Sequence, residues 1–412
     1  MKILFDFLTI ACKNGAAEYT RRVFYALLDR VKKENLRDVC IFCLYDSKAL
    51  PAYDDLRLEN LKCDFICFVD YQLGASAINE QNFDVFFLAC AHTAGWHPEI
   101  SRYECKSIIV VHDCVWEEMY NNDVSIYLAL NGNDMYRYRE TKPRGKKIYW
   151  DIKSPTIRFC RWLLHCREHG ILESGSKMLQ TSISLFHNRH DNEIVTVSNY
   201  SKNSLMYNFN LQEEKICVKY SPERVYQDFV NKNGIAKNER LRLLIGSKSK
   251  YYLIVSAGRE NKNAIKALRA FRAFSERRHD ASIVTIGFKK ELYNNHIDLP
   301  FLDDIDLREA YKHCYALIYP SFFEGFGYPP LEAMKYGKPV LSSNVCSMPE
   351  VLGDAPIYFS PIYESAIFNA LLSLDDENYE YHSRKSLRQY EIVSKRQAED
   401  LISLVDQLLH FD

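Results

Sequence analysis

The chain has 412 residues, about twice the length of a usual domain, so two domains with a cleft between them are expected. Hydrophobic residues make up 47% of the sequence, which is enough for sizeable cores. The 53 Lys and Arg residues nearly balance the 54 Asp and Glu residues, which argues against a nucleic-acid-binding protein with its basic excess.

Short apolar runs alternate with segments of helical spacing through the first half of the chain. Near-continuous apolar runs with polar flanks are typical of parallel strands buried on both faces. A helix is predicted after the first run, because apolar residues recur at helical spacing from Glu18 to Val31. The predicted strands are Ile3–Leu8, Val39–Tyr45, Phe65–Val69, Val85–Ala89, Ser107–Val111 and Ile194–Val197.

A second alternating series follows a polar, linker-like segment that begins after Tyr220. Helical patterns over 262–274 and 329–336 fill two of its gaps. Its predicted strands are Tyr252–Ser256, Ser282–Ile286, Ala316–Tyr319, Pro339–Leu341 and Ile357–Phe359.

Two βα series joined by a linker predict an α/β protein with two Rossmann-like, doubly wound domains. We expect the first domain over residues 1–220, the second over 221–390 and a C-terminal helix over 391–412. Ligands of such sheets bind at the carboxyl ends of the strands, so the loops at these ends are the places to search for chemistry.

The 13 cysteines have no regular spacing, and most lie in apolar, strand-like runs. Cys40 and Cys43 have the spacing of half a zinc site, but positions three apart on a strand face opposite sides of the sheet. Buried, reduced thiols are therefore expected, as in a reducing compartment. The longest apolar run, Val85–Ala91, is far shorter than the ~18 residues that span a membrane. A cytoplasmic protein without a signal peptide or metal site is predicted.

The segment 319–350 carries the most specific pattern in the sequence. A strand ends at its start, and the loop that follows contains Gly325 and Gly327, which allow the backbone to approach a ligand closely. Pro329 suits the first turn of a helix. Free N–H groups at such a helix start favour a phosphate or a sugar oxygen.

Two carboxylates accompany this loop. Glu332 is expected in the first helical turn, where its carboxylate could accept two hydroxyls of a ribose, and Glu324 could hold hydroxyls of a transferred sugar. The alternative is structural: Glu332 complements the helix dipole and Glu324 is solvated. The accompanying glycines, prolines and following strand favour the ligand-binding interpretation.

This segment is similar to the donor-site signature of the retaining GT-B glycosyltransferases, family four of the glycosyltransferase classification. The resemblance extends more weakly over most of the chain. It implies a nucleotide-diphosphate sugar as donor, with no metal ion and no other cofactor. The matching residues are Pro320, Ser321, Glu324, Gly325, Phe326, Gly327, Pro329, Glu332, Ala333, Met334, Gly337, Pro339, Val340, Ser347, Pro349 and Glu350.

A second element of the family's donor site follows the first strand of the second domain. The resemblance makes Arg259 and Lys262 the clamp for the donor diphosphate, and two cations can stabilise that leaving group without a metal. The family usually spaces these residues further apart, and an exposed, charged helix start is the alternative. Glu324 and the backbone of Phe326, Gly327 and Tyr328 are expected to hold the sugar.

The first domain shows weaker matches to the same family. The family's glycine loop after the first strand lies near the donor phosphate and the acceptor, and the resemblance makes Gly15 its donor-binding glycine, although Ala16 or Ala17 replaces the usual second glycine. His112, at the end of a buried strand, resembles the family's histidine that faces the transferred sugar; a structural histidine is the alternative. Ser198 is read as a helix cap.

The region between the strands at 107–111 and 194–197 is longer than the family needs. Residues 142–167 include eight Lys or Arg residues, with aromatic residues between them. A basic, aromatic amphipathic helix could bind the acceptor or make a peripheral contact with the inner face of a membrane. A surface helix packed on the first domain is the alternative.

The predicted function is therefore retaining transfer of a hexose, of mannose or rhamnose type, to a glycan or lipid-linked acceptor in surface polysaccharide synthesis. The donor base, guanosine or uridine, stays open. Two rivals are an epimerase or hydrolase of sugar nucleotides on the same fold and an inactive transferase-like scaffold. A third is a metal-dependent GT-A enzyme using Asp304 and Asp306, although capping of a helix explains this pair more simply.

Overall fold

The computed structural model describes residues 1–12, 14–49, 63–120, 180, 182–183, 192–224, 236–247 and 249–411. The predicted basic segment 142–167 lies outside these residues. The chain divides into two compact units, which are described separately. Unit 1 comprises the described residues within Met1–Trp116, Glu173–Val225 and Ser394–Asp412, and unit 2 those within Glu117–Leu172 and Tyr226–Val393.

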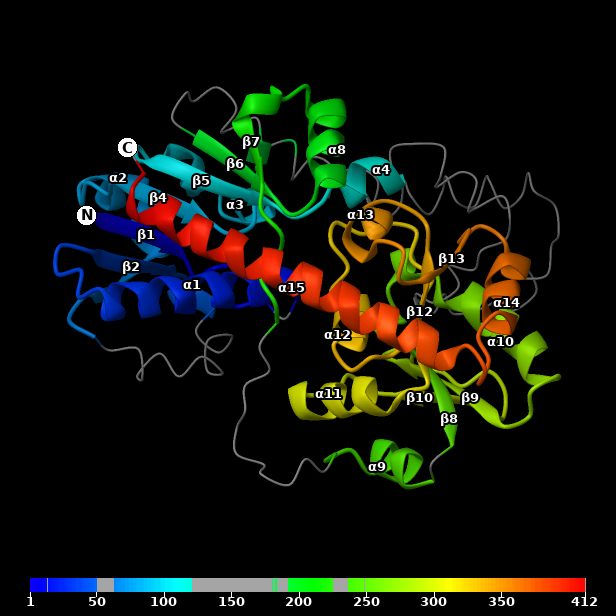
Figure 1. Ribbon diagram of the computed structural model, residues 1–412. Helices are drawn as coiled ribbons and strands as arrows, with labels where there is room; N and C mark the ends of the chain where they lie inside the picture. Colours follow the sequence, from blue (N-terminus) through cyan, green and yellow to red (C-terminus); the bar gives the residue numbers. More distant parts are fainter. Residues whose placement is uncertain are drawn as a thin grey trace, which may run out of the picture. The chain divides into compact units, whose positions relative to one another are not determined.

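Unit 1 is built on a parallel sheet with the strand order β3-β2-β1-β4-β5-β6-β7 (Figure 1). The first six strands correspond to the predicted ones, and the short β7 was not predicted. The strands are β1 (Lys2–Asp6), β2 (Cys40–Tyr45), β3 (Ile66–Asp70), β4 (Val85–Leu88), β5 (Lys106–Val111), β6 (Asn192–Thr196) and β7 (Ile216–Val218).

Helices cover both faces of this sheet, as its near-continuous apolar strands require. On one face, Phe24 of α1 packs edge-on against Phe5 and Phe7, at 5.3 and 4.8 Å between ring centroids. The other face buries Leu4 and Phe86 in a separate apolar cluster. The helices are α1 (Gly15–Lys33), α2 (Gly74–Asn79), α3 (His92–Trp96) and α8 (Asn199–Phe209). Short 3-10 turns are η3 (Tyr71–Leu73), η4 (Pro98–Arg102) and η7 (Glu213–Lys215). Helix α4 (Val115–Tyr120) follows β5.

Unit 2 contains a second parallel sheet, with the strand order β10-β9-β8-β11-β12-β13. Numbered from its own first strand, this order is 3-2-1-4-5-6, which is the Rossmann order. Strand β10 was not predicted. The strands are β8 (Lys250–Ile254), β9 (Ala281–Ile286), β10 (His296–Leu299), β11 (Ala316–Tyr319), β12 (Val340–Ser343) and β13 (Ile357–Phe359).

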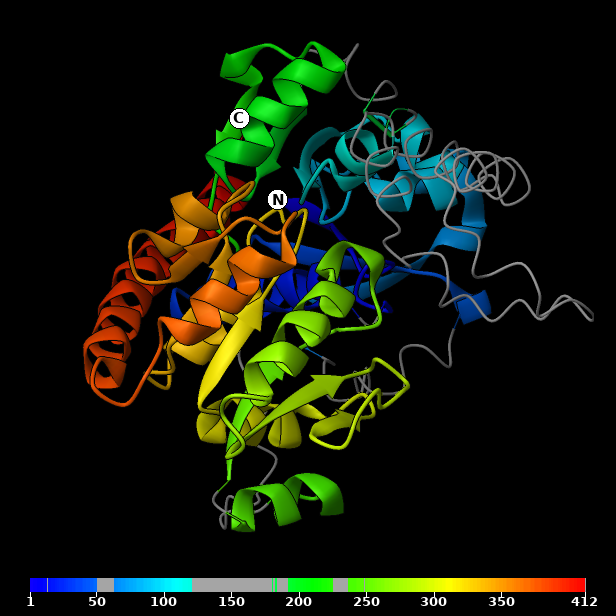
Figure 2. The same cartoon turned by 90° about the vertical axis from the view of Figure 1, so that its right-hand side faces the viewer.

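Helices also cover unit 2 on both sides. Helix α10 packs beside α14 over one face, and α12 lies beside α11 over the other (Figures 1 and 2). The Rossmann-like prediction is confirmed for both sheets. The helices are α9 (Glu239–Gly246), α10 (Ala264–Ser275), α11 (Asp304–His313), α12 (Tyr328–Met334), α13 (Met348–Leu352) and α14 (Glu364–Leu372), with a 3-10 turn η8 (Glu260–Lys262).

The long C-terminal helix α15 (Tyr379–Leu409) contributes to both units. Its first half contacts unit 2, where the Gln389 amide donates to Val351 O at 2.8 Å. Its second half contacts unit 1, where Arg30 pairs with Asp406 at 3.0 Å. The predicted return of a C-terminal helix to the first domain is confirmed, although the helix begins at Tyr379 and is longer than predicted.

Two observations bear on the expected compartment. Among the described residues, no helix combines the length and apolar character needed to cross a bilayer. All described cysteines are free thiols. Cys40 and Cys43 lie on β2 with different burial, and Cys43 is fully enclosed.

Candidate active site

The strand order of unit 2 places its candidate site at a topological switch point. Strands β8 and β11 are neighbours in the sheet, but the chain leaves them toward opposite sides. The crevice outside the carboxyl ends of such a strand pair is where open α/β sheets bind ligands. The loops that follow these two strands carry Arg259, Lys262 and Glu324, so the sheet gathers the donor-site residues predicted for unit 2.

Lys262 and Glu324 form the centre of this site. Lys262 Nζ lies 2.6 Å from Glu324 Oε1 and 2.9 Å from the hydroxyl of Tyr319, at the end of β11. The two charged side chains are only 8% and 12% exposed. The sequence separates them by 62 positions, and the adjacency of β8 and β11 brings them together.

The electrostatics of this cluster keep Tyr319 protonated. Burial, and then the charge of Glu324, raise the pKa of Tyr319 well above its ordinary value. The charge of Glu332 acts in the same direction. The Lys262 ammonium has three N–H donors, and the hydroxyl of Tyr319 and the carboxylate of Glu324 engage two of them. The third is available to an anionic oxygen.

Arg259 stands in the turn that leaves β8. It is exposed, and its guanidinium forms no ion pair or hydrogen bond with the described residues. The turn is tight, because a Cβ on Gly258 would lie 2.3 Å from the carbonyl oxygen of Gly287. The loops after β8 and β9 therefore touch through the backbones of these two glycines. This contact fixes the position of the backbone of Arg259, the residue that follows Gly258.

Two further residues hold the site loops in place. Asn263 has a left-handed backbone (φ 52°), and its amide donates to Pro320 O and Pro361 O at 3.0 Å each. Ser347 donates to the carbonyl oxygen of Glu324 at 2.9 Å. Ser347 matched the family pattern, but its hydrogen bond to the Glu324 loop could not be predicted from the sequence.

Helix α12 starts one residue earlier than its predicted range. Gly327 caps it with φ 95°, a conformation that favours glycine, and Phe326 is buried with its ring 5.7 Å from that of Tyr328. The prediction placed Glu332 in the first turn of this helix. Because the helix begins at Tyr328, Glu332 lies in its second turn instead. Glu332 is 8% exposed and lies close enough to Tyr319 to affect its pKa.

The predicted residues of unit 1 lie at the carboxyl edge of its own sheet. Gly15 is the first residue of α1, after the capping residue Asn14. His112 follows β5, and its Nε2 donates to Ala89 O at 2.9 Å, which leaves Nδ1 as the acceptor of a neutral ring. Burial lowers the pKa of His112, so the neutral form prevails near pH 7.

The Asp304 and Asp306 pair lies in the first turn of α11. Asp303, one residue earlier, caps the helix by accepting the N–H of Asp306 at 2.9 Å. The Asp306 carboxylate accepts the backbone N–H groups of Lys237 and Asn238, at 2.6 and 3.0 Å. These contacts explain the two aspartates by a structural role at the start of α11. No cluster of three or more metal-ligating side chains occurs in the described part of the chain.

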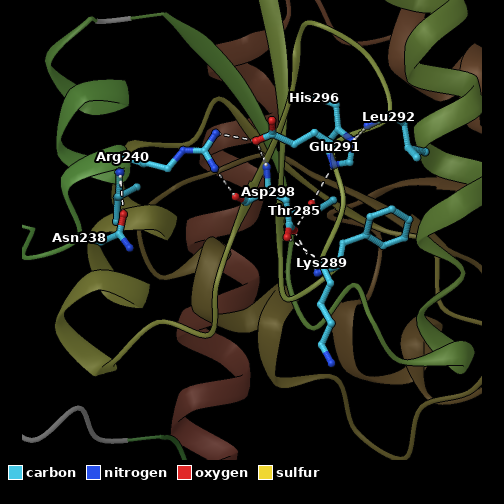
Figure 3. Close-up of polar contacts among 10 residues, drawn as sticks. Asn238, Arg240, Thr285, Lys289, Glu291, Leu292, His296 and Asp298 are labelled. Atoms are coloured by element: carbon cyan, nitrogen blue, oxygen red, sulfur yellow. Dashed lines mark hydrogen bonds and ion pairs between the residues drawn. The ribbon is translucent and has the colours of Figure 1, made fainter. Parts of the chain in front are cut away.

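A polar network that the sequence did not reveal lies at the β9–β10 end of the unit 2 sheet (Figure 3). Asp298 accepts the hydroxyl of Thr285 at 2.6 Å and the N–H groups of Phe288 and Lys289 at 3.0 and 2.7 Å. These bonds fix the loop after β9, whose Gly287 touches Gly258. The only sequence signal was the polar content of the short strand β10.

Comparisons with known proteins bear directly on unit 2. A family model described as "Glycosyl transferases group 1" matches residues 236–380. Within unit 2, this range is similar to glycosyl transferases group 1. The matched range includes Arg259, Lys262, Glu324 and Glu332, so every donor-site residue predicted in the second half of the chain lies within it.

Curated relatives extend this similarity. The O-antigen chain mannosyltransferase RfbU of Salmonella typhimurium is 28% identical over 44% of this chain and 50% of its own length. O-antigen chain mannosyltransferase B of Escherichia coli is 46% identical over 20% of this chain and 22% of its own length. The chain thus spans half or less of the length of these relatives.

Solved structures share the fold over nearly the whole chain. Anabaena HepE, crystallised with UDP-glucose, has a TM-score of 0.59 at 15% identity and covers 99% of this chain and 98% of its own. WaaG, described as a glycosyltransferase involved in lipopolysaccharide biosynthesis, has a TM-score of 0.54 at 12% identity, with 100% of both chains covered. The fold outside the matched range is therefore also that of GT-B glycosyltransferases.

Proposed function

We propose that the chain is a retaining, metal-independent glycosyltransferase that transfers mannose from a nucleoside-diphosphate sugar to a glycan or lipid-linked acceptor in surface polysaccharide synthesis. The observation that carries the proposal is the buried Lys262, Glu324 and Tyr319 cluster at the switch point of unit 2, with Arg259 exposed in the adjoining turn and unpaired with any described residue. The group 1 match supports glycosyl transfer, and the names of RfbU and mannosyltransferase B support mannose. HepE, crystallised with UDP-glucose, supports a nucleotide-sugar donor.

In this proposal, each of the two cations has a different task. Glu324 neutralises most of the charge of Lys262, because the two groups are 2.6 Å apart in a nearly buried position. The pair therefore lies at the junction of sugar and diphosphate: Glu324 holds sugar hydroxyls and Lys262 gives its remaining N–H to a phosphate oxygen. Arg259 supplies the uncompensated positive charge that a diphosphate needs.

The reaction proceeds on one face of the sugar. The bond between C1 and the phosphate oxygen breaks, with its electron pair going to the diphosphate, which Arg259 and Lys262 stabilise. The acceptor hydroxyl oxygen forms a bond to C1 from the same face, and its proton passes to the departing phosphate oxygen. Glu332 holds the ribose, and His112 orients the sugar.

Nucleotide binding by variants at Arg259 tests the donor site. Arg259→Met removes an exposed side chain, so folding should persist, whereas a Lys262 variant would leave Glu324 buried and uncompensated. The matched control is Arg278→Met, an exposed arginine just before β9, at the opposite end of the strands. Calorimetric titration with GDP and UDP should show at least ~10-fold weaker binding for Arg259→Met alone. Equal affinities for both variants would remove Arg259 from the site.

Transfer itself is tested with octyl α-D-mannoside as acceptor and GDP-mannose, UDP-glucose and related sugar nucleotides as donors. Mass spectrometry should detect a glycoside extended by one hexose, and NMR should show that the donor's anomeric configuration is retained. Excess EDTA should leave the rate unchanged. Consumption of the donor without any acceptor product would favour a hydrolase or epimerase, and failure to bind any nucleoside diphosphate would favour an inactive scaffold.

A further inference from the structure

A polar cluster at the carboxyl edge of the unit 1 sheet contains a histidine to which neither the sequence nor the proposed function gave a role. The loop after β4 crosses the end of β5, because Ala91 N–H donates to Val110 O at 2.8 Å. His92 follows directly and starts α3. It lies near enough to His112 and Asp113 for their charges to affect one another.

The two ring nitrogens of His92 have different surroundings. Nδ1 lies 3.9 Å from Cys90 Sγ, and burial raises the pKa of Cys90 to about 12, so this neighbour stays a neutral thiol. Nε2 is buried and has no hydrogen-bond partner among the described residues. Buried polar atoms are nearly always hydrogen-bonded, and an unbonded one destabilises the fold. Nε2 of His92 therefore lacks the hydrogen-bond partner that a buried nitrogen needs.

The charge of the cluster indicates what that partner is. Burial lowers the pKa values of His92 and His112, so both rings are neutral near pH 7. The nearby charge is the carboxylate of Asp113, one oxygen of which accepts the N–H of Val115 at 3.1 Å. The carboxylate repels a phosphate, and the two neutral imidazoles carry no charge that would offset this repulsion. They suit a hydroxyl group, which both donates and accepts a hydrogen bond, as a neutral imidazole does.

We propose that His92 binds a hydroxyl group of the acceptor sugar through Nε2, beside His112. This inference rests on the proposed function and extends it, because the loops of unit 2 account for the charged donor and leave the uncharged substrate without named partners. His92 is thus a specificity-determining residue of unit 1, at the loop after β4.

Four variants separate a hydrogen bond at Nε2 from a packing role. His92→Phe keeps the ring and removes both nitrogens. The side-chain amide nitrogen of Gln reaches about as far as Nε2, and that of Asn only as far as Nδ1, so His92→Gln and His92→Asn form a matched pair. His97→Gln is the control, because His97 already contacts Thr93 O at 3.3 Å and Asp46 at 3.8 Å.

The measurements are initial rates with octyl α-D-mannoside as acceptor, calorimetric affinity for GDP and UDP, thermal unfolding, and binding of the glycoside without donor by saturation-transfer NMR. His92→Phe and His92→Asn should raise the KM for the glycoside at least ~10-fold and weaken its NMR signal. His92→Gln should recover most of the affinity. The donor KM, nucleotide affinity and the behaviour of His97→Gln should match the wild type.

An unchanged glycoside KM in His92→Phe, in an enzyme that transfers sugar, would overturn the role of His92 and leave the proposed function standing. Equal losses in His92→Gln and His92→Asn would show that ring packing, and not Nε2, matters. Failure of the wild type to transfer sugar or to bind the glycoside would overturn the proposed function and the acceptor site together.

Discussion

At the scale of single residues, the proposed roles of Lys262 and Glu324 separate affinity for the nucleotide from recognition of the sugar. The carboxylate lies 2.6 Å from the ammonium and weakens its attraction for a second anion. In the proposed donor complex, a phosphate oxygen takes the remaining N–H of Lys262 while Glu324 stays paired with the ammonium.

Glu324→Gln is expected to bind nucleoside diphosphates more tightly and to transfer sugar more slowly. The neutral amide keeps a hydrogen bond to Lys262 but no longer offsets its charge, so GDP or UDP affinity should rise about 3- to 10-fold. The transfer rate should fall at least ~100-fold, because the variant loses a charged acceptor for sugar hydroxyls. Calorimetry and steady-state rates measure the two effects. A parallel fall in both quantities would contradict the division of roles.

Gly258 offers a prediction about backbone contact. A Cβ at this position would lie 2.3 Å from Gly287 O, so Gly258→Ala must push the loops after β8 and β9 apart. We expect a loss of about 1–3 kcal/mol in stability together with weaker nucleotide binding, because Arg259 is the next residue. Gly246→Ala is the control: no atom lies within 4 Å of its Cβ, and alanine in helix α9 should stabilise slightly. Denaturant unfolding measures the stability of both variants, and an unchanged stability of Gly258→Ala would contradict the prediction.

At the scale of elements, the network around β9 and β10 links the fold of unit 2 to pH. Leu292 N–H donates to His296 Nδ1 at 3.1 Å, and His296 Nε2 therefore donates to Thr285 Oγ1 at 2.8 Å (Figure 3). Both nitrogens are engaged in the neutral form. Burial lowers the pKa of His296 from its ordinary 6.5, although the carboxylates of Asp298 and Glu291 act in the opposite direction.

The sign of the pH dependence follows from this lowered pKa. Below pH 6.5 the unfolded chain takes up a proton at His296 that the folded chain does not, so the stabilising contribution is complete above that pH. It is lost as the pH falls from 6.5 toward the folded pKa. His296→Gln should be less stable at pH 7.5 but should lose stability less steeply between pH 7 and 5. The slope should differ by at most ~1.4 kcal/mol per pH unit.

Urea unfolding at several pH values tests this linkage. Parallel stability curves for the wild type and His296→Gln would show that His296 titrates alike in both states. The remaining slope of the variant comes partly from His92, His112 and His382, whose pKa values are also lowered by burial.

The same elements show why the sequence predicts part of the fold and not the rest. Ala316–Tyr319 is a run of buried apolar residues, and its predicted limits are those of β11. His296–Leu299 contains His and Asp at half of its positions, so its apolar signal is too weak to predict β10. The short β7 was missed as well, because Ile216–Val218 is too brief to stand out.

The candidate site divides in a similar way. The motif identified Glu324 and Lys262, but the contact between them depends on the order of strands, which periodicity does not contain. Glu332 lies one residue further into the helix than predicted, in the second turn, because helix limits are uncertain by a few residues when they are inferred from prolines alone. His92 carries no motif, and only its buried nitrogen in the folded chain reveals it.

At the scale of the whole molecule, each unit has its own parallel sheet and its own core, and helix α15 belongs to both. Within unit 1, Gln397 donates to Ser221 O, and the Tyr220 N–H donates to Asp400 at 2.7 Å. Ligand binding to one unit should therefore stabilise that unit without equally stabilising the other.

Hydrogen exchange can show, along the single helix α15, whether a ligand stabilises one unit more than the other. A nucleoside diphosphate at 100 times its Kd stabilises the structure that binds it by about 2.7 kcal/mol, and the proposed contacts all lie in unit 2. GDP or UDP should therefore slow exchange in β8 to β13 and in residues 379–393 of α15. Strands β1 to β7 and residues 394–409 should change little. Arg259→Met should lose the protection at the same nucleotide concentration. Equal protection of both sheets would mean that unit 1 also contributes to the nucleotide site, which would contradict the assignment of the donor diphosphate to unit 2 alone.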